Sequence, residues 1–207
     1  MNRVNLIAHP LVQYNLGRLR DQRTEPEDFR RSLAQVAALM VYEATRSLET
    51  RAATVTTPLA KASVQKMQRE IVLVPVLRAG LGMLNAILDL IPRARVGFIG
   101  LKRHEQTLKA NVYHKSLPTD LGEHEVILID PMLATGGSAV AALNLLAERG
   151  AKRLRLVNLV AAPEGIRHVH RFFPELPIFT AAVDDHLNEQ GYIVPGLGDA
   201  GDRLFGV

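Results

Sequence analysis

Short apolar runs alternate with helix-like segments over the central and C-terminal parts of the chain. The apolar runs cover residues 71–77, 96–101, 126–129, 154–161 and 178–183. Apolar and polar residues alternate poorly within them, which is typical of strands that are covered on both faces. The helix-like segments that separate most of the runs cover residues 81–91, 138–149 and 164–173. This alternation predicts the α/β class, with a parallel sheet and helices on both of its faces.

A long amphipathic helix is predicted near the N-terminus, from Glu27 to about Glu49. Its apolar residues recur at steps of three and four and share one face: Phe29, Leu33, Val36, Ala37, Met40, Val41 and Ala44. Thr24 and Glu27 have the spacing of a capping box, and Pro26 falls in the first helical turn, where proline is tolerated. The polar stretch at residues 54–69 has only a weak pattern, and we expect a hairpin or another excursion there.

The chain shows no internal repeat, low-complexity tract or linker, so its 207 residues predict one domain, residues 1–207. In parallel sheets of this class, ligands bind beyond the carboxyl ends of the strands, where loops lead into helices. The predicted strands that end at Leu77, Leu101 and Ile129 are each followed by unusual polar residues. We therefore expect the functional site at these three strand ends.

The segment after the third of these strands has the features of a phosphate-binding loop. It consists of Asp130, Pro131, Met132, Leu133, Ala134, Thr135, Gly136, Gly137 and Ser138. A helix N-terminus attracts phosphate, and Gly136 and Gly137 let the backbone curl around the anion. Thr135 and Ser138 can donate to phosphate oxygens, whereas Asp130 can accept from sugar hydroxyls. The segment predicts a site for a phosphorylated ribose; the alternative is an ordinary capped helix start. The dinucleotide and Walker fingerprints are both absent from the chain.

Two arginines stand at the other two strand ends. Arg78 directly follows the 71–77 run, and Arg103 follows the 96–101 run. An arginine fork binds phosphate oxygens at two points, which lysine does less well. Two forks at neighbouring strand ends would suit a diphosphate. For each arginine alone, a surface charge or an ion pair is the alternative.

Glycines and a proline crowd the C-terminal segment, where we expect them to prevent regular structure. They are Gly191, Pro195, Gly196, Gly198, Gly201 and Gly206. Such a stretch is either a loose tail or a backbone shaped around a ligand. The apolar residues Tyr192, Ile193, Leu197 and Phe205 favour the second interpretation, because a loose tail has little use for them.

The composition of the chain indicates which ligands the protein suits and excludes several kinds of site. The 25 basic and 21 acidic residues give a formal net charge of +4, which suits anionic ligands. The basic residues are dispersed, so they support a nucleic-acid partner only weakly, and none is expected. The absence of cysteine excludes disulfides, thiolate zinc sites and cysteine nucleophiles. Because the chain has no apolar run long enough to span a membrane and no signal-peptide core, we expect a cytoplasmic protein without a membrane partner.

Two motifs resemble those of a known family. The segment Asp-Pro-Met-Leu-Ala-Thr-Gly-Gly-Ser resembles the signature with which type I phosphoribosyltransferases bind PRPP (5-phosphoribosyl 1-diphosphate), in the form found in uracil phosphoribosyltransferases. In most type I relatives a second acidic residue adjoins the first, whereas here Pro131 and Met132 follow Asp130 and leave one carboxylate for the ribose. The segment Gly-Tyr-Ile-x-Pro-Gly-Leu-Gly-Asp-Ala-Gly-Asp-Arg-x-Phe-Gly at residues 191–206 is similar to the same family. Weaker similarity extends over nearly the whole chain.

The resemblance implies a fold, an activity and a set of site residues. The fold would be type I phosphoribosyltransferase-like, a parallel sheet flanked by helices with a small C-terminal hood that binds the base. The activity would be that of a pentosyltransferase that converts uracil and PRPP to UMP and diphosphate in pyrimidine salvage. PRPP would contact Arg78, Arg103, Asp130 to Ser138 and Asp199. Uracil would contact Ile193, Gly198, Asp199 and Ala200. The candidate catalytic residues are Asp130, Arg103 and Asp199.

The resemblance also implies a flap over the substrate, a cofactor and partners. Residues 107–118 would be a flap that closes over PRPP, and we expect a loop there. Mg²⁺ is the expected cofactor, held largely by PRPP and water rather than by a metal site of the protein. We expect a homo-oligomer, a dimer or larger, and GTP is a candidate effector. Two alternatives stay open: the same fold acting on a purine or orotate, and an RNA-binding regulator of pyrimidine genes, which would need a contiguous basic face.

Overall fold

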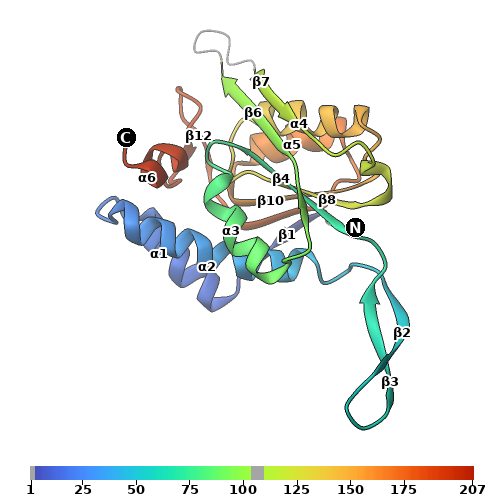
Figure 1. The fold of residues 1–207 in the computed structure, drawn as a ribbon. Helices are drawn as coiled ribbons and strands as arrows, with labels where there is room; N and C mark the ends of the chain where they lie inside the picture. Colours follow the sequence, from blue (N-terminus) through green and yellow to red (C-terminus); the bar gives the residue numbers. More distant parts are fainter. Residues whose placement is uncertain (1–2, 104–109) are drawn as a thin grey trace.

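The computed structural model describes residues 3–103 and 110–207. Its centre is a sheet with the strand order β1–β11–β10–β8–β4–β6–β7 (Figure 1). These strands are β1 (Val4–Leu6), β4 (Ile71–Leu77), β6 (Phe98–Arg103), β7 (Ala110–Ser116), β8 (Glu125–Ile129), β10 (Arg153–Ala161) and β11 (Ile178–Val183). Neighbours in this order are parallel except β6 and β7. Two short strands, β5 (Arg95–Val96) and β9 (Met132–Leu133), pair with β4 and β10. The predicted α/β class is confirmed.

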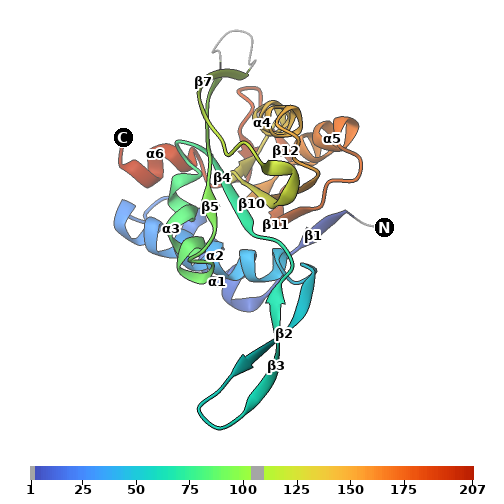
Figure 2. The ribbon, with the colours of Figure 1, turned by 45° about the vertical axis from the view of Figure 1, so that its right-hand side comes forward.

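Helices cover both faces of the sheet, as predicted (Figures 1 and 2). One face carries α1 (Pro10–Arg20), α2 (Pro26–Ala44) and α3 (Leu81–Leu90), and the other carries α4 (Gly137–Glu148) and α5 (Pro163–Phe172). Alternate residues of β4 point to opposite layers: Ile71 and Leu73 join the α1–α3 core, whereas Val72 and Val74 join the α4–α5 core. The apolar runs of the sequence lack alternation because both faces of these strands are buried.

Helix α2 ends at Ala44, before the predicted Glu49. The predicted capping box is wrong, because the N-cap residue is Glu25 and it makes no side-chain cap. The Thr24 hydroxyl instead donates to the Arg18 carbonyl (2.6 Å), which ties the start of α2 to the last turn of α1. Of the helices in the described residues, none is both long and apolar enough to cross a membrane.

Helix α1 is missing from the elements predicted from the sequence, although its buried Val12, Leu16 and Leu19 recur at steps of four and three. Gly17 is exposed, and apart from the neighbouring backbone of the helix itself no atom lies within 4 Å of the position that a Cβ would take. We expect Gly17→Ala to raise the free energy of unfolding by about 1 kcal/mol, the difference in helix propensity between the two residues. Urea denaturation followed by circular dichroism measures this change. An unchanged or lower denaturation midpoint would contradict the prediction.

The polar stretch at residues 54–69 belongs to a hairpin, the first of the two structures expected there. Strands β2 (Thr50–Thr56) and β3 (Lys61–Met67) are antiparallel, with Thr50 opposite Met67 and Thr56 opposite Lys61. The hairpin projects away from the sheet and its helices (Figures 1 and 2). Most of its side chains are exposed, which explains the weak apolar pattern.

The loop predicted at residues 107–118 is wrong for most of its length. Residues 110–116 form β7, which pairs with β6 so that Phe98 lies opposite Ser116 and Leu101 lies opposite Val112. The side chains of residues 111–116 are exposed, so this edge strand shows no apolar period although its backbone is paired. The first part of the predicted flap, residues 107–109, lies outside the described residues.

Candidate active site

A cleft of about 440 Å³ opens at the carboxyl ends of β4 and β8. Its walls come from three segments that are far apart in the sequence: residues 76–79, the loop after β8, and residues 190–201. The loop contributes Asp130, Met132, Ala134 and Ser138, and β6 adds Leu101. The three strand ends chosen from the sequence therefore meet at one place, and the C-terminal segment joins them there.

The segment Asp130–Ser138, here called the 130–138 loop, is held by the backbone of β10. The Asp130 N–H donates to a β10 carbonyl (3.1 Å), and the Pro131 carbonyl accepts from two β10 N–H groups (2.9 and 3.2 Å). Within the loop the short strand β9 directs neighbouring side chains to opposite sides. Met132 lines the cleft, whereas the Leu133 side chain is buried in the α4–α5 core. Pro131 and Leu133 thus serve to hold the loop, and their neighbours face the cleft.

Helix α4 begins at this loop without a side-chain cap. Its N-cap residue is Gly136, in the left-handed region at φ 80°. A Cβ at Gly136 would lie 2.8 Å from the Gly165 carbonyl oxygen, so the tight turn requires glycine. The Gly137 N–H donates to the Thr135 hydroxyl (3.4 Å), and Ser138 in the first turn lines the cleft. A helix start of this kind presents N–H groups and the positive end of the helix dipole, which suits an anion.

Of the two arginines predicted to grip a diphosphate, Arg78 lines the cleft. It is exposed and directly follows β4, and its guanidinium carbon lies 5.9 Å from the centroid of the Phe205 ring. Arg103 is the last residue of β6, which pairs with β4 through Ile99 and Val76. The Arg103 side chain lies outside the described part of the structure, so its assignment stays a prediction.

The C-terminal segment is more regular than predicted. Strand β12 (His186–Leu187) pairs with β13 (Ile193–Val194), and helix α6 (Ala200–Phe205) follows. Gly198 and Gly206, before and after α6, have φ values of 77° and 73°. Gly206 is the left-handed C-cap of α6, and Gly198 directly precedes its N-cap residue, so neither glycine prevents this helix. The four residues expected to contact the base, Ile193, Gly198, Asp199 and Ala200, all line the cleft.

Asp199 has a structural role that sequence reasoning missed, since it is the N-cap of α6. Its Oδ1 accepts hydrogen bonds from the N–H groups of Gly201 (2.8 Å) and Asp202 (3.0 Å). An aspartate before a short helical stretch is a common N-cap, so the signal was present in the sequence. The capping bonds fix the carboxylate of Asp199 at the wall of the cleft.

The cleft also includes residues that sequence reasoning did not select. Gln190, Gly191 and Tyr192 line it from the turn between β12 and β13. Asn188 holds this turn, because its Oδ1 accepts from the N–H groups of Gln190 (3.1 Å) and Tyr192 (2.9 Å). An asparagine followed by a glycine three residues later is a turn signal, but only the structure shows that the turn faces the cleft.

A second cleft, of about 570 Å³, lies near the amino ends of β8 and β10. Its buried carboxylate, Glu125, lies 3.4 Å from Arg155, 3.5 Å from Arg153 and 3.9 Å from Arg69. None of the predicted site residues lines this cleft. Because its arginines face a carboxylate of the protein itself, the first cleft is the better candidate for an active site.

The chain is similar to proteins of known family over its whole length. The family model of uracil phosphoribosyltransferase matches residues 6–207. The uracil phosphoribosyltransferase of Shouchella clausii is 53% identical over 207 residues, which cover 100% of this chain and 99% of that protein. The protein of the same name from Thermoanaerobacter sp. strain X514 is 52% identical over 204 residues, which cover 98% and 97% of the two chains.

Solved structures agree with the fold. The AQ2163 protein of Aquifex aeolicus matches with a TM-score of 0.95 at 39% identity and covers 99% of this chain and 98% of its own. A purine phosphoribosyltransferase from Pyrococcus horikoshii matches with a TM-score of 0.53 at 15% identity, over 74% and 84% of the two chains, which is a similarity of fold alone. The resemblance drawn from the two motifs is confirmed by the family model and the full-length relatives. The chain belongs to the uracil phosphoribosyltransferase family.

Proposed function

We propose that this chain is a pentosyltransferase that converts uracil and PRPP into UMP and diphosphate, and that residues 1–207 act as one domain. The observation that carries the proposal is the meeting of the 130–138 loop with residues 190–201 in a single cleft. The start of α4, which suits a phosphate, therefore faces the same cleft as the backbone of residues 190–201, which suits the edge of a base. A transferase that joins a base to a phosphorylated sugar requires this arrangement.

The parts of PRPP correspond to three features of the cleft. The 5-phosphate accepts hydrogen bonds from the N–H groups at the start of α4 and from the hydroxyls of Thr135 and Ser138. The Asp130 carboxylate accepts from the ribose hydroxyls. Arg78, together with Arg103, binds the diphosphate, because guanidinium forks match its oxygens at two points.

Uracil occupies the end of the cleft that Ile193, Gly198 and Ala200 line. It presents two carbonyl acceptors with an N–H between them, an edge that the backbone N–H and C=O groups of this segment can match. Cytosine would present a donor where uracil has O4 and would leave buried groups unpaired. A site of this type discriminates between the two bases by roughly 10⁴ or more.

The reaction forms a bond from N1 of uracil to C1 of the ribose, while the bond from C1 to the diphosphate oxygen breaks and leaves its electron pair on diphosphate. The N1 proton passes to a base, for which Asp199 is the candidate. Positive charge builds on the ribose ring and negative charge on the departing oxygens, so catalysis consists mostly of positioning and electrostatic stabilisation. Arg78 and Arg103 stabilise the leaving group, and Asp130 holds the ribose.

Mg²⁺ is expected to arrive with the substrate. Among the described residues, no group of three or more His, Cys, Asp or Glu side chains is arranged to hold a metal ion. Asp130 and Asp199 offer the cleft oxygen ligands of the kind that Mg²⁺ prefers, which fits an ion bound mainly to PRPP and water. An ion bound in this way would neutralise part of the charge of the diphosphate.

Asp199→Asn is expected to lower kcat about 100-fold, because an amide cannot accept the N1 proton and water must replace it. The melting temperature should stay the same, because asparagine caps helices about as well as aspartate. Asp202→Asn is the matched control, since Asp202 lies in the first turn of α6 outside the cleft. Steady-state kinetics at saturating substrates compares the two variants. Equal values of kcat would show that Asp199 does not accept the N1 proton.

The proposed activity is tested by mixing the protein with Mg²⁺, PRPP and one free base at a time. We expect UMP from uracil and no nucleotide from cytosine, orotate, hypoxanthine or guanine. If nucleotide forms from orotate or a purine instead, the base substrate of the enzyme is that base and not uracil. RNA binding that weakens steeply with salt, measured by gel shift, would support the regulator alternative.

The remaining parts of the proposal concern the setting of the reaction. We expect a cytoplasmic enzyme of pyrimidine salvage that assembles as a homo-oligomer, and GTP is the candidate effector. Analytical ultracentrifugation gives the number of subunits. Rates measured with and without GTP, at PRPP concentrations below its KM, show whether GTP activates the enzyme.

A further inference from the structure

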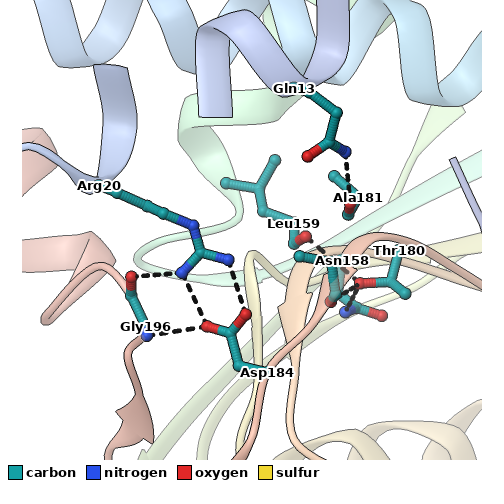
Figure 3. Close-up of polar contacts among 9 residues, drawn as sticks. Gln13, Arg20, Asn158, Leu159, Thr180, Ala181, Asp184 and Gly196 are labelled. Carbon is teal, nitrogen blue, oxygen red and sulfur yellow. Dashed lines mark hydrogen bonds and ion pairs between the residues drawn. The ribbon is translucent and has the colours of Figure 1, made fainter. Parts of the chain in front are cut away.

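An ion pair between distant parts of the chain lies behind the C-terminal wall of the cleft. Arg20, the last residue of α1, donates through its Nη1 (2.8 Å) and Nη2 (2.6 Å) to the two carboxylate oxygens of Asp184, which follows β11 (Figure 3). The Asp184 side chain is 5% exposed and that of Arg20 is 26% exposed. Burying two charges costs solvation free energy, so a pair of this kind is best explained by the geometry that it imposes.

Both backbone groups of Gly196 bond to this pair. The Gly196 N–H donates to the Asp184 carboxylate (2.8 Å), and the Gly196 carbonyl accepts from Nη1 of Arg20 (2.7 Å), as Figure 3 shows. Gly196 has a φ of 60°, and a Cβ there would lie 2.1 Å from the Ile193 carbonyl oxygen. Gly196 is therefore folded tightly against Ile193, which lines the cleft. Loss of the ion pair would therefore displace Gly196, and Gly196 would displace Ile193.

The segment is fixed at two further points. The Asp184 N–H donates to the Ala161 carbonyl at the end of β10 (2.8 Å), which anchors the ion pair to the sheet. On the other side of Gly196, Arg203 of α6 donates to the Leu197 carbonyl (3.0 Å) and to the Asp21 carbonyl (2.6 Å). Arginines at the end of α1 and in α6 thus hold consecutive residues of the segment that leads from Ile193 to Gly198.

We propose that Arg20 and Asp184 are positioning residues for the base. They fix Gly196, and through it the backbone groups of Ile193 and Gly198 that recognise uracil. Neither residue lines the cleft, so they act through the C-terminal segment and not by contact with substrate. The proposal rests on the proposed function for the identity of the base, but the hold on Gly196 can be measured without any substrate.

The test compares Arg20→Ala and Arg20→Lys with the unchanged protein. We expect Arg20→Ala to raise the KM for uracil about 100-fold, far more than the KM for PRPP, because displacement of a recognition group by about 1 Å has effects of this size. Arg20→Lys keeps the charge but cannot bond to Asp184 at two points and to Gly196 as well, so we expect a rise of about tenfold. Asp184→Ala added to Arg20→Ala should have little further effect, because the two residues act as one unit.

A matched control separates positioning from a general loss of stability. Thr180 of β11 is fully buried; it accepts from Asn158 (3.0 Å) and donates to the Ala182 carbonyl (2.8 Å), and none of its bonds reaches residues 193–200 (Figure 3). Thr180→Val should lower the melting temperature and leave the KM for uracil unchanged. Hydrogen–deuterium exchange of the substrate-free proteins gives a second measurement: residues 193–198 should exchange faster in both Arg20 variants and not in Thr180→Val.

These measurements distinguish failure of the positioning role from failure of the proposed function. Equal rises in the KM for uracil and for PRPP, or unchanged exchange at residues 193–198, would overturn the positioning role. If Arg20→Ala does not fold, Arg20→Lys gives the answer from the same two measurements. If the unchanged protein makes no UMP, the proposed function fails, while the exchange experiment still decides whether Arg20 holds the segment.

Discussion

Asp130→Asn should lower kcat/KM for PRPP about 100-fold, which corresponds to about 2.7 kcal/mol of transition-state stabilisation. The Asp130 backbone is fixed by its hydrogen bond to β10, and the carboxylate stands at the wall of the cleft. Asparagine has the same shape, but it replaces a charged acceptor by a neutral amide that places an N–H donor toward a hydroxyl. The ribose would lose a charge-assisted hydrogen bond as positive charge builds on its ring.

The effect of Asp130→Asn is measured by steady-state kinetics with PRPP varied at saturating uracil. Asp185→Asn is the matched control, since Asp185 is an exposed aspartate that also follows a sheet strand but does not line the cleft. The control should keep the kinetics of the unchanged protein, and both variants should keep its melting temperature. A rate for Asp130→Asn within a factor of about two of the control would show that this carboxylate does not hold the ribose.

Gly165→Ala should raise the KM for PRPP about 100-fold, although Gly165 itself does not line the cleft. A Cβ at Gly165 would lie 2.3 Å from the Ala134 carbonyl oxygen and 2.7 Å from the Leu133 carbonyl oxygen, which are backbone atoms of the 130–138 loop. Helix α5 and the loop are both anchored in this core, through Val169 and Leu133, so relief of this clash shifts the loop against α5. The N–H groups proposed to bind the 5-phosphate would move with it.

Comparison of the KM values for PRPP and uracil shows whether Gly165→Ala affects the phosphate-binding loop alone. The KM for uracil should change much less than the KM for PRPP, because the atoms that the new Cβ displaces belong to the loop proposed to bind the 5-phosphate and not to residues 193–200. Gly17→Ala is the control, the same substitution at a helical glycine that has open space around it. If Gly165→Ala leaves the KM for PRPP unchanged while it lowers the melting temperature, the loop adjusts without loss of phosphate binding, contrary to our expectation.

The sheet and its layers could be predicted because strands buried on both faces leave a strong mark on the sequence. The β4 strand at Ile71–Leu77 and the β11 strand at Ile178–Val183 coincide with the apolar runs. Elements that are exposed leave no such mark. Strand β7 lacks an apolar pattern because the side chains of residues 111–116 are in solvent, and the pairing that makes it a strand belongs to the backbone.

The candidate site was predictable where a local motif sets the geometry. The 130–138 loop combines a strand end, small residues and a helix start within nine consecutive positions, so its interpretation needs no tertiary information. Arg20 bonds to Asp184 and Gly196, which both lie more than 160 positions further along the chain, and no local pattern indicates these contacts. Likewise, only the packing of α5 against the loop shows why residue 165 is a glycine.

The most direct test of a single cleft for the phosphate and the base is a crystal structure of the protein bound to UMP. We predict that the phosphate lies within hydrogen-bond distance of the N–H groups at the start of α4, and that the uracil ring lies against Ile193 and the residues from Gly198 to Ala200. A phosphate bound elsewhere, for example beside Arg153 and Arg155 in the second cleft, or a uracil ring away from residues 193–200, would contradict it.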